Sequence, residues 1–259
     1  MPEKTLVLIT RTRPAAEALA EQVAALGCEP FQCAPFELEP PENPEAVSDD
    51  LAMALPADRV ILTSHEAVRQ TVGLVGTRQL NRALVIVPGQ GTASIARDLG
   101  LDNVIYPERH GTSEAMLAMP ELRDVEGLEI LILAAAGGRS LMGEVLEKRG
   151  AVVERIHVYR RVACELPDET AGRIASAEAL VTLGASLEAV TGLIERLPEP
   201  AADTIRSAPL VVPSQRVADH ATRMGFRHCL IATGASDEAM LARLQRLVEV
   251  SPGRGSRNL

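Results

Sequence analysis

Short polar turns follow the apolar segments of this chain at regular intervals, and they carry most of the side chains that could do chemistry. Each turn combines hydroxyl, glycine or arginine residues with the start of a helical pattern. The turns lie at Thr10-Arg11, Thr63-Ser64, Gly89 to Thr92, Thr112-Ser113, Gly137 to Arg139, Thr182 to Ser186, Ser214 and Ala235-Ser236. Each turn alone is most simply a helix cap. Together they favour binding of an anionic small molecule, because helix starts offer free N–H groups to anions.

Other kinds of chemistry find little support in the sequence. The turn Gly89-Gln-Gly91 has Ser94 where a dinucleotide loop needs its third glycine, and no Walker lysine follows any glycine turn. The five histidines show no metal-ligand spacing, and no nucleophile elbow occurs. We therefore expect neither a metal nor a cofactor, and a chemistry that depends on binding and orientation. Tyr159 is either an amphipathic plug between domains or a hydrogen-bond donor in a cleft.

Composition restricts the class of protein. The chain has 259 residues, 46% of them hydrophobic, but only two Tyr, three Phe and no Trp, so the core must be aliphatic. A net charge of −9 argues against a general partner among nucleic acids or anionic membranes. The four cysteines form no CxxC pair, which is typical of reduced thiols in a cytoplasmic protein. No apolar run is long enough to span a membrane.

Apolar strands alternate with helical patterns along the chain. Thr5 to Thr10 is a continuous apolar run, typical of a parallel strand buried on both faces. Pro14 to Leu26 predicts a helix that ends at Gly27. The same rhythm resumes at Arg59 and continues to a closing helix near Val248. This alternation predicts an α/β fold with doubly wound parallel sheets.

The second half of the chain repeats the first. The segment from Val85 to Gly100 matches the segment from Val211 to Gly225, at a spacing of 125 positions. The first strand and helix, Leu6 to Gly27, match Ile130 to Gly150. A repeat of this length indicates duplication of a half-molecule rather than a solenoid. The second copy has Ser214-Gln-Arg216 where the first has Gly89-Gln-Gly91. The copies therefore share a polar helix start, but they do not share a glycine-rich phosphate-binding motif.

Two extended segments suggest where the chain passes between domains. Glu29 to Glu39 and Val152 to Val162 occupy equivalent places in the two copies. We therefore predict one discontinuous domain, residues 1–31 plus 164–250, and a second domain at residues 41–154. Residues 32–40 and 155–163 would be linker strands, and residues 251–259 a flexible tail. The alternative is two sequential halves, which would give a stable proteolytic fragment ending near residue 125.

Several segments together resemble one known family. They are Ile61 to Val68, Gly89 to Ala93, Gly138-Arg139 with Leu146 and Gly150, Val158 to Arg160, and Val212 to Ala218. In order and spacing they resemble the bacterial type of uroporphyrinogen-III synthase, from Leu6 to about Val250. The resemblance implies two α/β domains joined by a two-stranded crossover linker, with a cleft between them.

The resemblance also implies a reaction. Linear hydroxymethylbilane would lose its hydroxyl as water and close to uroporphyrinogen III with the terminal pyrrole ring inverted, without a cofactor. The substrate is a tetrapyrrole with eight carboxylates, and the hydroxyl and N–H groups of the polar turns are suited to bind them. From the composition and the cysteines we expect a cytoplasmic protein that binds neither nucleic acid nor membrane, and from the lack of an amphipathic seam a monomer. The resemblance leaves room for transient contact with the preceding pathway enzyme.

The resemblance assigns roles to particular positions. Tyr159 matches a tyrosine proposed to assist departure of the hydroxyl, which makes it the expected catalytic residue. The expected substrate-binding residues are Arg11, Thr63, Ser64, Gly89, Thr92, Ser113, Gly138, Arg139, Ser186 and Ser214. One departure concerns Ala134 to Ala136, which replaces a commoner polar turn and leaves Arg139 as the anion-binding candidate there.

Two other functions remain open from the sequence. A two-domain ligand-binding sensor, built like a periplasmic binding protein, would share the α/β lobes and the crossings, although no secretion signal is present. A regulatory module of the same fold would keep the architecture without the activity.

Overall fold

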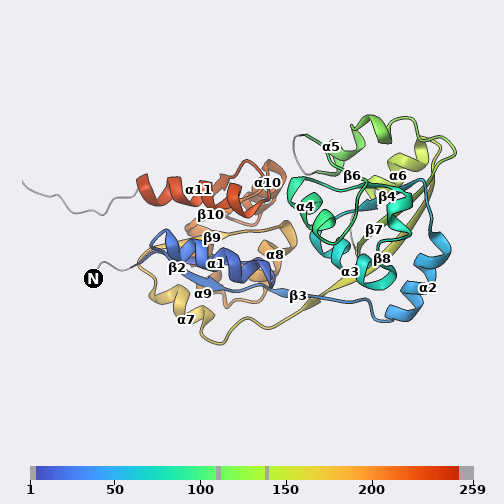
Figure 1. Cartoon of the computed structure of the whole chain (residues 1–259). Helices are drawn as coiled ribbons and strands as arrows, with labels where there is room; N and C mark the ends of the chain where they lie inside the picture. Colours follow the sequence, from blue (N-terminus) through green and yellow to red (C-terminus); the bar gives the residue numbers. More distant parts are fainter. Residues whose placement is uncertain (1–3, 109–111, 138–139, 251–259) are drawn as a thin grey trace, which may run out of the picture. The chain divides into compact units, whose positions relative to one another are not determined.

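The computed structural model describes residues 4–108, 112–137 and 140–250. The chain divides into two compact units, the first formed by residues 1–37 and 163–259 and the second by residues 38–162. Figure 1 shows the helices and strands of both units along the sequence. The predicted linker boundaries at 32–40 and 155–163 stay a prediction.

The first unit is built on a five-stranded sheet in the order β11-β10-β9-β1-β2, and every neighbouring pair is parallel. Its strands are β1 (Leu6–Ile9), β2 (Glu29–Gln32), β9 (Leu180–Leu183), β10 (Pro209–Val212) and β11 (His228–Ile231). Its helices are α1 (Ala15–Ala25), α7 (Thr170–Ser176), α8 (Leu187–Glu195), α9 (Glu199–Ser207), α10 (Gln215–Arg223) and α11 (Asp237–Val250).

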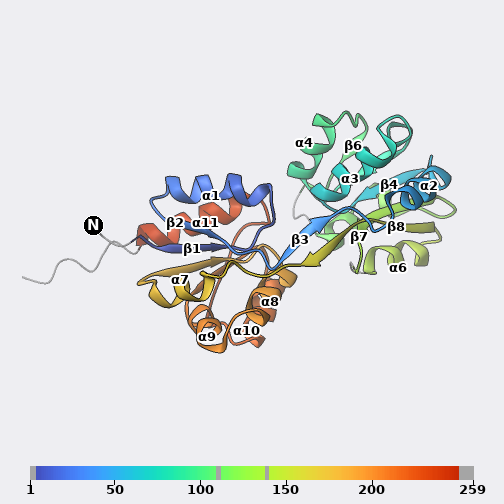
Figure 2. The same ribbon diagram turned by 90° about the horizontal axis from the view of Figure 1, so that it is seen from below.

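Helices cover both faces of this sheet. Alternate residues of β1 point to opposite sides, because side chains along a strand alternate. Val7 and Ile9 pack with α1 and α11, whereas Leu6 and Leu8 pack with α7 to α10. Figure 2 shows α1 and α11 on one side of the strands and α7, α8, α9 and α10 on the other. The unit is therefore doubly wound, with two aliphatic core layers.

The second unit has a six-stranded sheet in the order β3-β8-β7-β4-β5-β6. The pairs β8–β7, β7–β4, β4–β5 and β5–β6 are parallel, and β3 lies beside β8. The strands are β3 (Phe36–Glu39), β4 (Arg59–Leu62), β5 (Leu84–Ile86), β6 (Val104–Ile105), β7 (Glu129–Ala135) and β8 (Val152–Ala163). The helices are α2 (Pro44–Ala54), α3 (His65–Val75), α4 (Gln90–Asp98), α5 (Ser113–Leu117) and α6 (Leu141–Lys148), with short 3₁₀ turns at Leu80–Arg82 and Pro120–Leu122.

This second sheet is also covered on both faces. Helices α2, α3 and α4 pack on the side that carries Leu62 and Leu133, whereas α5 and α6 pack on the side of Ile61 and Ile132. The core is aliphatic in both units, as the scarcity of aromatic residues predicts. In the sequence these positions form continuous apolar runs because each strand is buried on both faces.

The strand orders of the two units support the duplication. The two strand orders can be aligned, β11-β10-β9-β1-β2 with β6-β5-β4-β7-β8. In this alignment β1 corresponds to β7, β9 to β4, and β10 to β5. The two units thus share one topology, with chain connections permuted between them. The two α/β units with parallel sheets confirm the fold class expected from the sequence.

Candidate functional site

The side chains of Ser64 and Tyr159 meet beyond the carboxyl end of β4. Ser64 is the N-cap of α3, and its Oγ accepts a hydrogen bond from the backbone N–H of Ala67 at 3.1 Å. The same Oγ lies 3.0 Å from the phenol oxygen of Tyr159 on β8. Tyr159 is buried, with 4% of the residue's surface exposed, and packs in the core layer beneath α3. A polar link therefore joins a helix start to a strand of the same unit.

An irregularity in β8 directs Tyr159 into this position. The parallel register of β7 and β8 shifts after Ala134, so that Ala134 pairs with His157 and Ala135 with Tyr159. The extra residue, Val158, makes two consecutive side chains face the same core layer, since Val158 and Tyr159 both pack there. Bulges of this kind re-aim a side chain that regular alternation would send to the other face.

In each unit, one threonine at the end of a central strand hydrogen-bonds to the end of the neighbouring strand. Thr63, after β4, donates its hydroxyl to the carbonyl of Leu133 at 3.0 Å. Thr10, after β1, donates its hydroxyl to the carbonyl of Leu183 at 2.9 Å and accepts the N–H of Ala185 at 3.0 Å. The proton of the Thr63 hydroxyl is thus used within the protein, which leaves its lone pairs for a ligand.

Replacing Thr10 by valine should lower the free energy of unfolding by about 1 kcal/mol, because the Ala185 N–H loses its acceptor. Thr10 is 1% exposed, and valine has nearly its shape, so packing changes little. Chemical denaturation of the variant measures the effect. A stability equal to that of the parent chain would show that the hydroxyl contributes nothing net.

The remaining helix starts differ in how their polar groups are used. Ser186 caps α8, its Oγ accepting the N–H of Ala189 at 3.1 Å. Ser214 is the N-cap of α10 in nearly the same backbone conformation, but its hydroxyl makes no capping bond. Gly89 is the extended N-cap of α4. In the strand correspondence, Ser64 matches Ser186 and Gly89 matches Ser214, so the first matched pair of helix starts is capped by a side chain in both units and the second pair in neither.

The other residues expected to bind substrate differ in how exposed they are. Thr92 lies in the first turn of α4 and is 4% exposed. Thr112 rather than Ser113 is the N-cap of α5, since its hydroxyl accepts the N–H of Ala115 at 3.2 Å. Gly138 and Arg139 lie outside the described residues. Thr92 can therefore reach a ligand only through a small part of its surface or through backbone groups, whereas Ser113 is partly exposed.

Arg11 is already engaged with other groups of the first unit. Its Nε lies 2.7 Å from a carboxylate oxygen of Asp237, and its Nη2 donates to the carbonyl of Ala235 at 2.7 Å. Both partners lie at or just before the start of α11, and Ala235 is 224 positions further along the chain. The guanidinium thus fixes the loop before α11, and its charge is partly neutralised. No pattern in the sequence indicates the pairing with Asp237.

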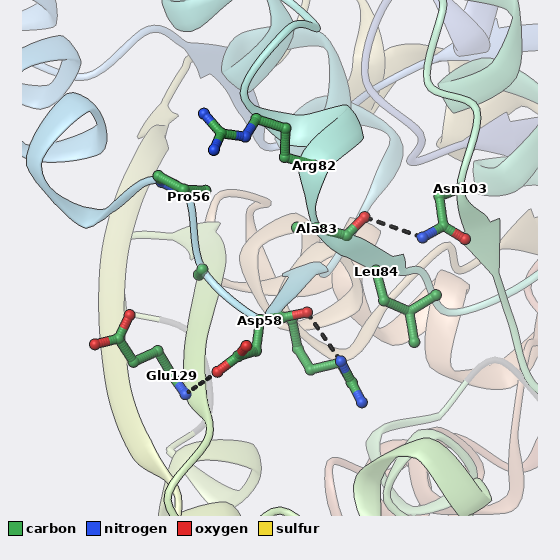
Figure 3. A pocket seen from close by; sticks show the side chains of 9 residues that line it. Pro56, Asp58, Arg82, Ala83, Leu84, Asn103 and Glu129 are labelled. Atoms are coloured by element: carbon green, nitrogen blue, oxygen red, sulfur yellow. Dashed lines mark hydrogen bonds between the residues drawn. The ribbon is translucent and has the colours of Figure 1, made fainter.

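A hollow in the second unit lies at the opposite edge of the sheet. Figure 3 shows it lined by residues that precede or begin β4, β5 and β7, among them Asp58, Leu84 and Glu129. Asp58 accepts the N–H of Glu129 at 2.9 Å, and Asn103 donates to the carbonyl of Ala83 at 3.3 Å (Figure 3). Since ligands of parallel α/β sheets bind at the carboxyl ends of the strands, we do not place the functional site here.

No cluster of three or more His, Cys, Asp or Glu side chains arranged for a metal ion occurs in the described part of the chain. Among the helices of residues 4–108, 112–137 and 140–250, none is both long and apolar enough to cross a membrane. The donors that the site offers are hydroxyl groups, a phenol and backbone N–H groups.

Comparison with known proteins gives the family. The model of the family described as uroporphyrinogen-III synthase HemD matches residues 17–242. The chain belongs to the uroporphyrinogen-III synthase family. Uroporphyrinogen-III synthase of Salmonella typhimurium is 30% identical over 246 residues, which cover 92% of this chain and 99% of that protein. The enzyme of Escherichia coli K12 is 28% identical with the same coverage.

Solved structures of uroporphyrinogen-III synthases share the fold. A mutant of the Thermus thermophilus enzyme aligns with a TM-score of 0.63 and 20% identity, covering 95% of this chain and 99% of that one. The Helicobacter pylori enzyme aligns with a TM-score of 0.60 and 14% identity, covering 94% and 99%. Membership of the family confirms the resemblance drawn from the sequence. It assigns the chain to tetrapyrrole biosynthesis as a lyase, and it does not favour the binding-module alternative.

Proposed function

We propose that this chain cyclises hydroxymethylbilane to uroporphyrinogen III, with Tyr159 as the hydrogen-bond donor to the departing hydroxyl. The observation that carries the role of Tyr159 is the 3.0 Å contact of its phenol oxygen with Ser64 Oγ, beyond the carboxyl end of β4. A buried ring with its hydroxyl held at a helix start is suited to a directed proton donation. The chain should consume hydroxymethylbilane faster than the spontaneous cyclisation does.

The bond changes of this step balance within substrate and protein. The carbon–oxygen bond to the hydroxyl breaks, its electron pair leaves with the oxygen, and that oxygen takes the phenol proton and departs as water. The pyrrole system stabilises the cation that remains. When the terminal pyrrole ring attacks and the macrocycle closes, the carbon skeleton releases a proton that restores the phenol. Neither an oxidant nor a reductant is needed.

The substrate carboxylates are the second part of the proposal. We propose that the substrate contacts the polar groups at strand ends, its carboxylates accepting from the free donors and its pyrrole N–H groups donating to the Thr63 hydroxyl. The polar groups are those of Arg11, Thr63, Ser64, Gly89, Thr92, Ser113, Gly138, Arg139, Ser186 and Ser214. Ser214 has the strongest support, because its hydroxyl is not used as a cap. Arg11 would act with Asp237 attached, as a donor of oriented N–H groups rather than as a free charge.

Replacing Ser214 by alanine should raise KM about tenfold, because a hydrogen bond to a charged group contributes about 1.5 kcal/mol or more. Stability should stay unchanged, since no cap is lost. The matched variant Ser186→Ala removes a true cap in the same unit and should cost about 1 kcal/mol of stability. Steady-state kinetics and thermal denaturation of both variants measure these effects. An unchanged KM for Ser214→Ala would remove that residue from the binding set.

Location and partners follow from the same proposal. Cys28, Cys33, Cys164 and Cys229 are free thiols. Burial raises the pKa of the Cys33 thiol to about 12, so this thiol stays protonated at neutral pH. These observations support a reducing compartment such as the cytoplasm. We also propose a monomer that makes at most transient contact with the enzyme supplying its unstable substrate, and that binds neither nucleic acid nor membrane.

A further inference from the structure

The hydroxyl of Ser64 joins two hydrogen bonds that have different roles. One holds the start of α3, through the N–H of Ala67 at 3.1 Å. The other reaches the phenol of Tyr159 at 3.0 Å, where either oxygen can be the donor. Within the described residues, neither hydroxyl has a further protein partner at its oxygen. The direction of the Ser64–Tyr159 bond therefore decides which of the two groups has a proton left for a ligand.

The number of protons and lone pairs on each hydroxyl distinguishes the two possible directions of the Ser64–Tyr159 hydrogen bond. A hydroxyl has one proton and two acceptor lone pairs. If Tyr159 donates to Ser64, then Ser64 Oγ accepts twice, and the phenol proton is unavailable to a substrate. If Ser64 donates to Tyr159, the N–H of Ala67, the Ser64 hydroxyl and the phenol form a chain of donors that point the same way. Hydrogen bonds in such a chain polarise one another and strengthen together.

We propose that Ser64 donates to Tyr159 and acts as a positioning residue, which frees the phenol proton for the departing hydroxyl. This inference rests on the role proposed above for Tyr159. As the phenol proton moves to the leaving oxygen, negative charge develops on the Tyr159 oxygen, and the Ser64 O–H becomes a charge-assisted donor to it. The amino end of α3, an 11-residue helix, also favours negative charge nearby. Ser64 thus acts mainly after the proton has begun to move.

A double-mutant cycle tests whether Ser64 acts through Tyr159. Ser64→Gly removes the hydroxyl and keeps most of the helix start, because glycine is a tolerated N-cap. With the Tyr159 phenol present, Ser64→Gly should lower kcat roughly tenfold or more, the effect of a lost bond to a charged group. KM should change little, because glycine keeps the backbone N–H through which position 64 would contact a substrate carboxylate. In the Tyr159→Phe background, the same change should lower kcat no further. Ser64→Thr restores a hydroxyl and should recover most of the rate.

A second cap in the same unit controls for helix stability. Asn43 is the N-cap of α2, which also has 11 residues, and its side chain accepts the N–H of Ala46 at 3.1 Å. Asn43→Ala should destabilise the protein by at least as much as Ser64→Gly and leave kcat unchanged. If it lowered kcat as much as Ser64→Gly, the loss of rate would come from helix stability, and the inference would be overturned.

The remaining outcomes separate this inference from the proposed function. If Ser64→Gly lowers kcat by the same factor in both backgrounds, Ser64 acts independently of Tyr159 and the inference is wrong. If Ser64→Gly has the kcat of the parent chain while Tyr159→Phe has a lowered kcat, only the role of Ser64 is overturned. A parental kcat for Tyr159→Phe overturns the role of Tyr159 in the proposed function, and the inference with it.

Discussion

Replacing Tyr159 by phenylalanine should lower kcat by about 10²- to 10⁴-fold, the usual contribution of a positioned proton donor. The change removes a single oxygen atom from a residue that is 4% exposed, so the packing of the core layer is retained. The lost contact with Ser64 should cost only about 1 kcal/mol of stability. Steady-state kinetics with hydroxymethylbilane measure the effect on turnover, and thermal denaturation checks the fold.

The second tyrosine of the chain supplies the matched control. Tyr106 follows β6, and its ring lies against the guanidinium of Arg97, whose carbon is 5.8 Å from the ring centroid. Tyr106→Phe keeps this ring contact and should leave kcat unchanged. If the two phenylalanine variants have equal turnover numbers, the phenol of Tyr159 has no part in the reaction.

Replacing Gly184 by alanine should lower the free energy of unfolding by about 1–3 kcal/mol, the usual cost of overpacking a core. Gly184 follows β9, and a Cβ atom there would lie 2.6 Å from Val190 Cγ2 and 3.1 Å from Leu210 Cδ1. Val190 is 1% exposed on α8, and a β-branched side chain in a helix has little freedom to rotate away. Chemical denaturation of the purified variant measures the loss.

A glycine in the same unit provides the comparison. Gly172 lies inside α7, and a Cβ atom there would meet nothing within 4 Å. Gly172→Ala should stabilise the protein by up to about 1 kcal/mol, because alanine favours the helix. A Gly184→Ala variant as stable as Gly172→Ala would show that the close approach of α8 to β9 and β10 relaxes without cost.

Local patterns are sufficient to predict much of the fold. The helix starts at Ser64, Ser186 and Thr112 follow from hydroxyl residues placed just before helical patterns, and each caps its helix. Helices α2, α7 and α9 are absent from the sequence-based prediction. Helix α2 begins at Pro44, a few residues after the predicted linker strand 32–40. A signal is present, because Asn43-Pro44 combines a capping side chain with proline at the first helical position.

The arrangement of the site depends on contacts that sequence patterns do not carry. The register shift beside Ala134 depends on how β7 and β8 pair, and it determines that Tyr159 faces α3. Local sequence marks Ser64 only as a cap, and its second partner lies 95 positions away. Arg11 reads as a free anion-binding residue until the fold brings Asp237 to 2.7 Å. Strand pairing and long-range packing thus decide which polar groups remain available to a substrate.

The isomer composition of the product shows directly whether the chain inverts the terminal pyrrole ring as proposed. Purified protein would be incubated with hydroxymethylbilane, the porphyrinogens oxidised, and the isomers separated by chromatography beside a protein-free control. The proposed function predicts predominantly isomer III, with the terminal pyrrole ring inverted, whereas the control yields mainly isomer I. Isomer I as the main product in the presence of folded protein would contradict the assignment.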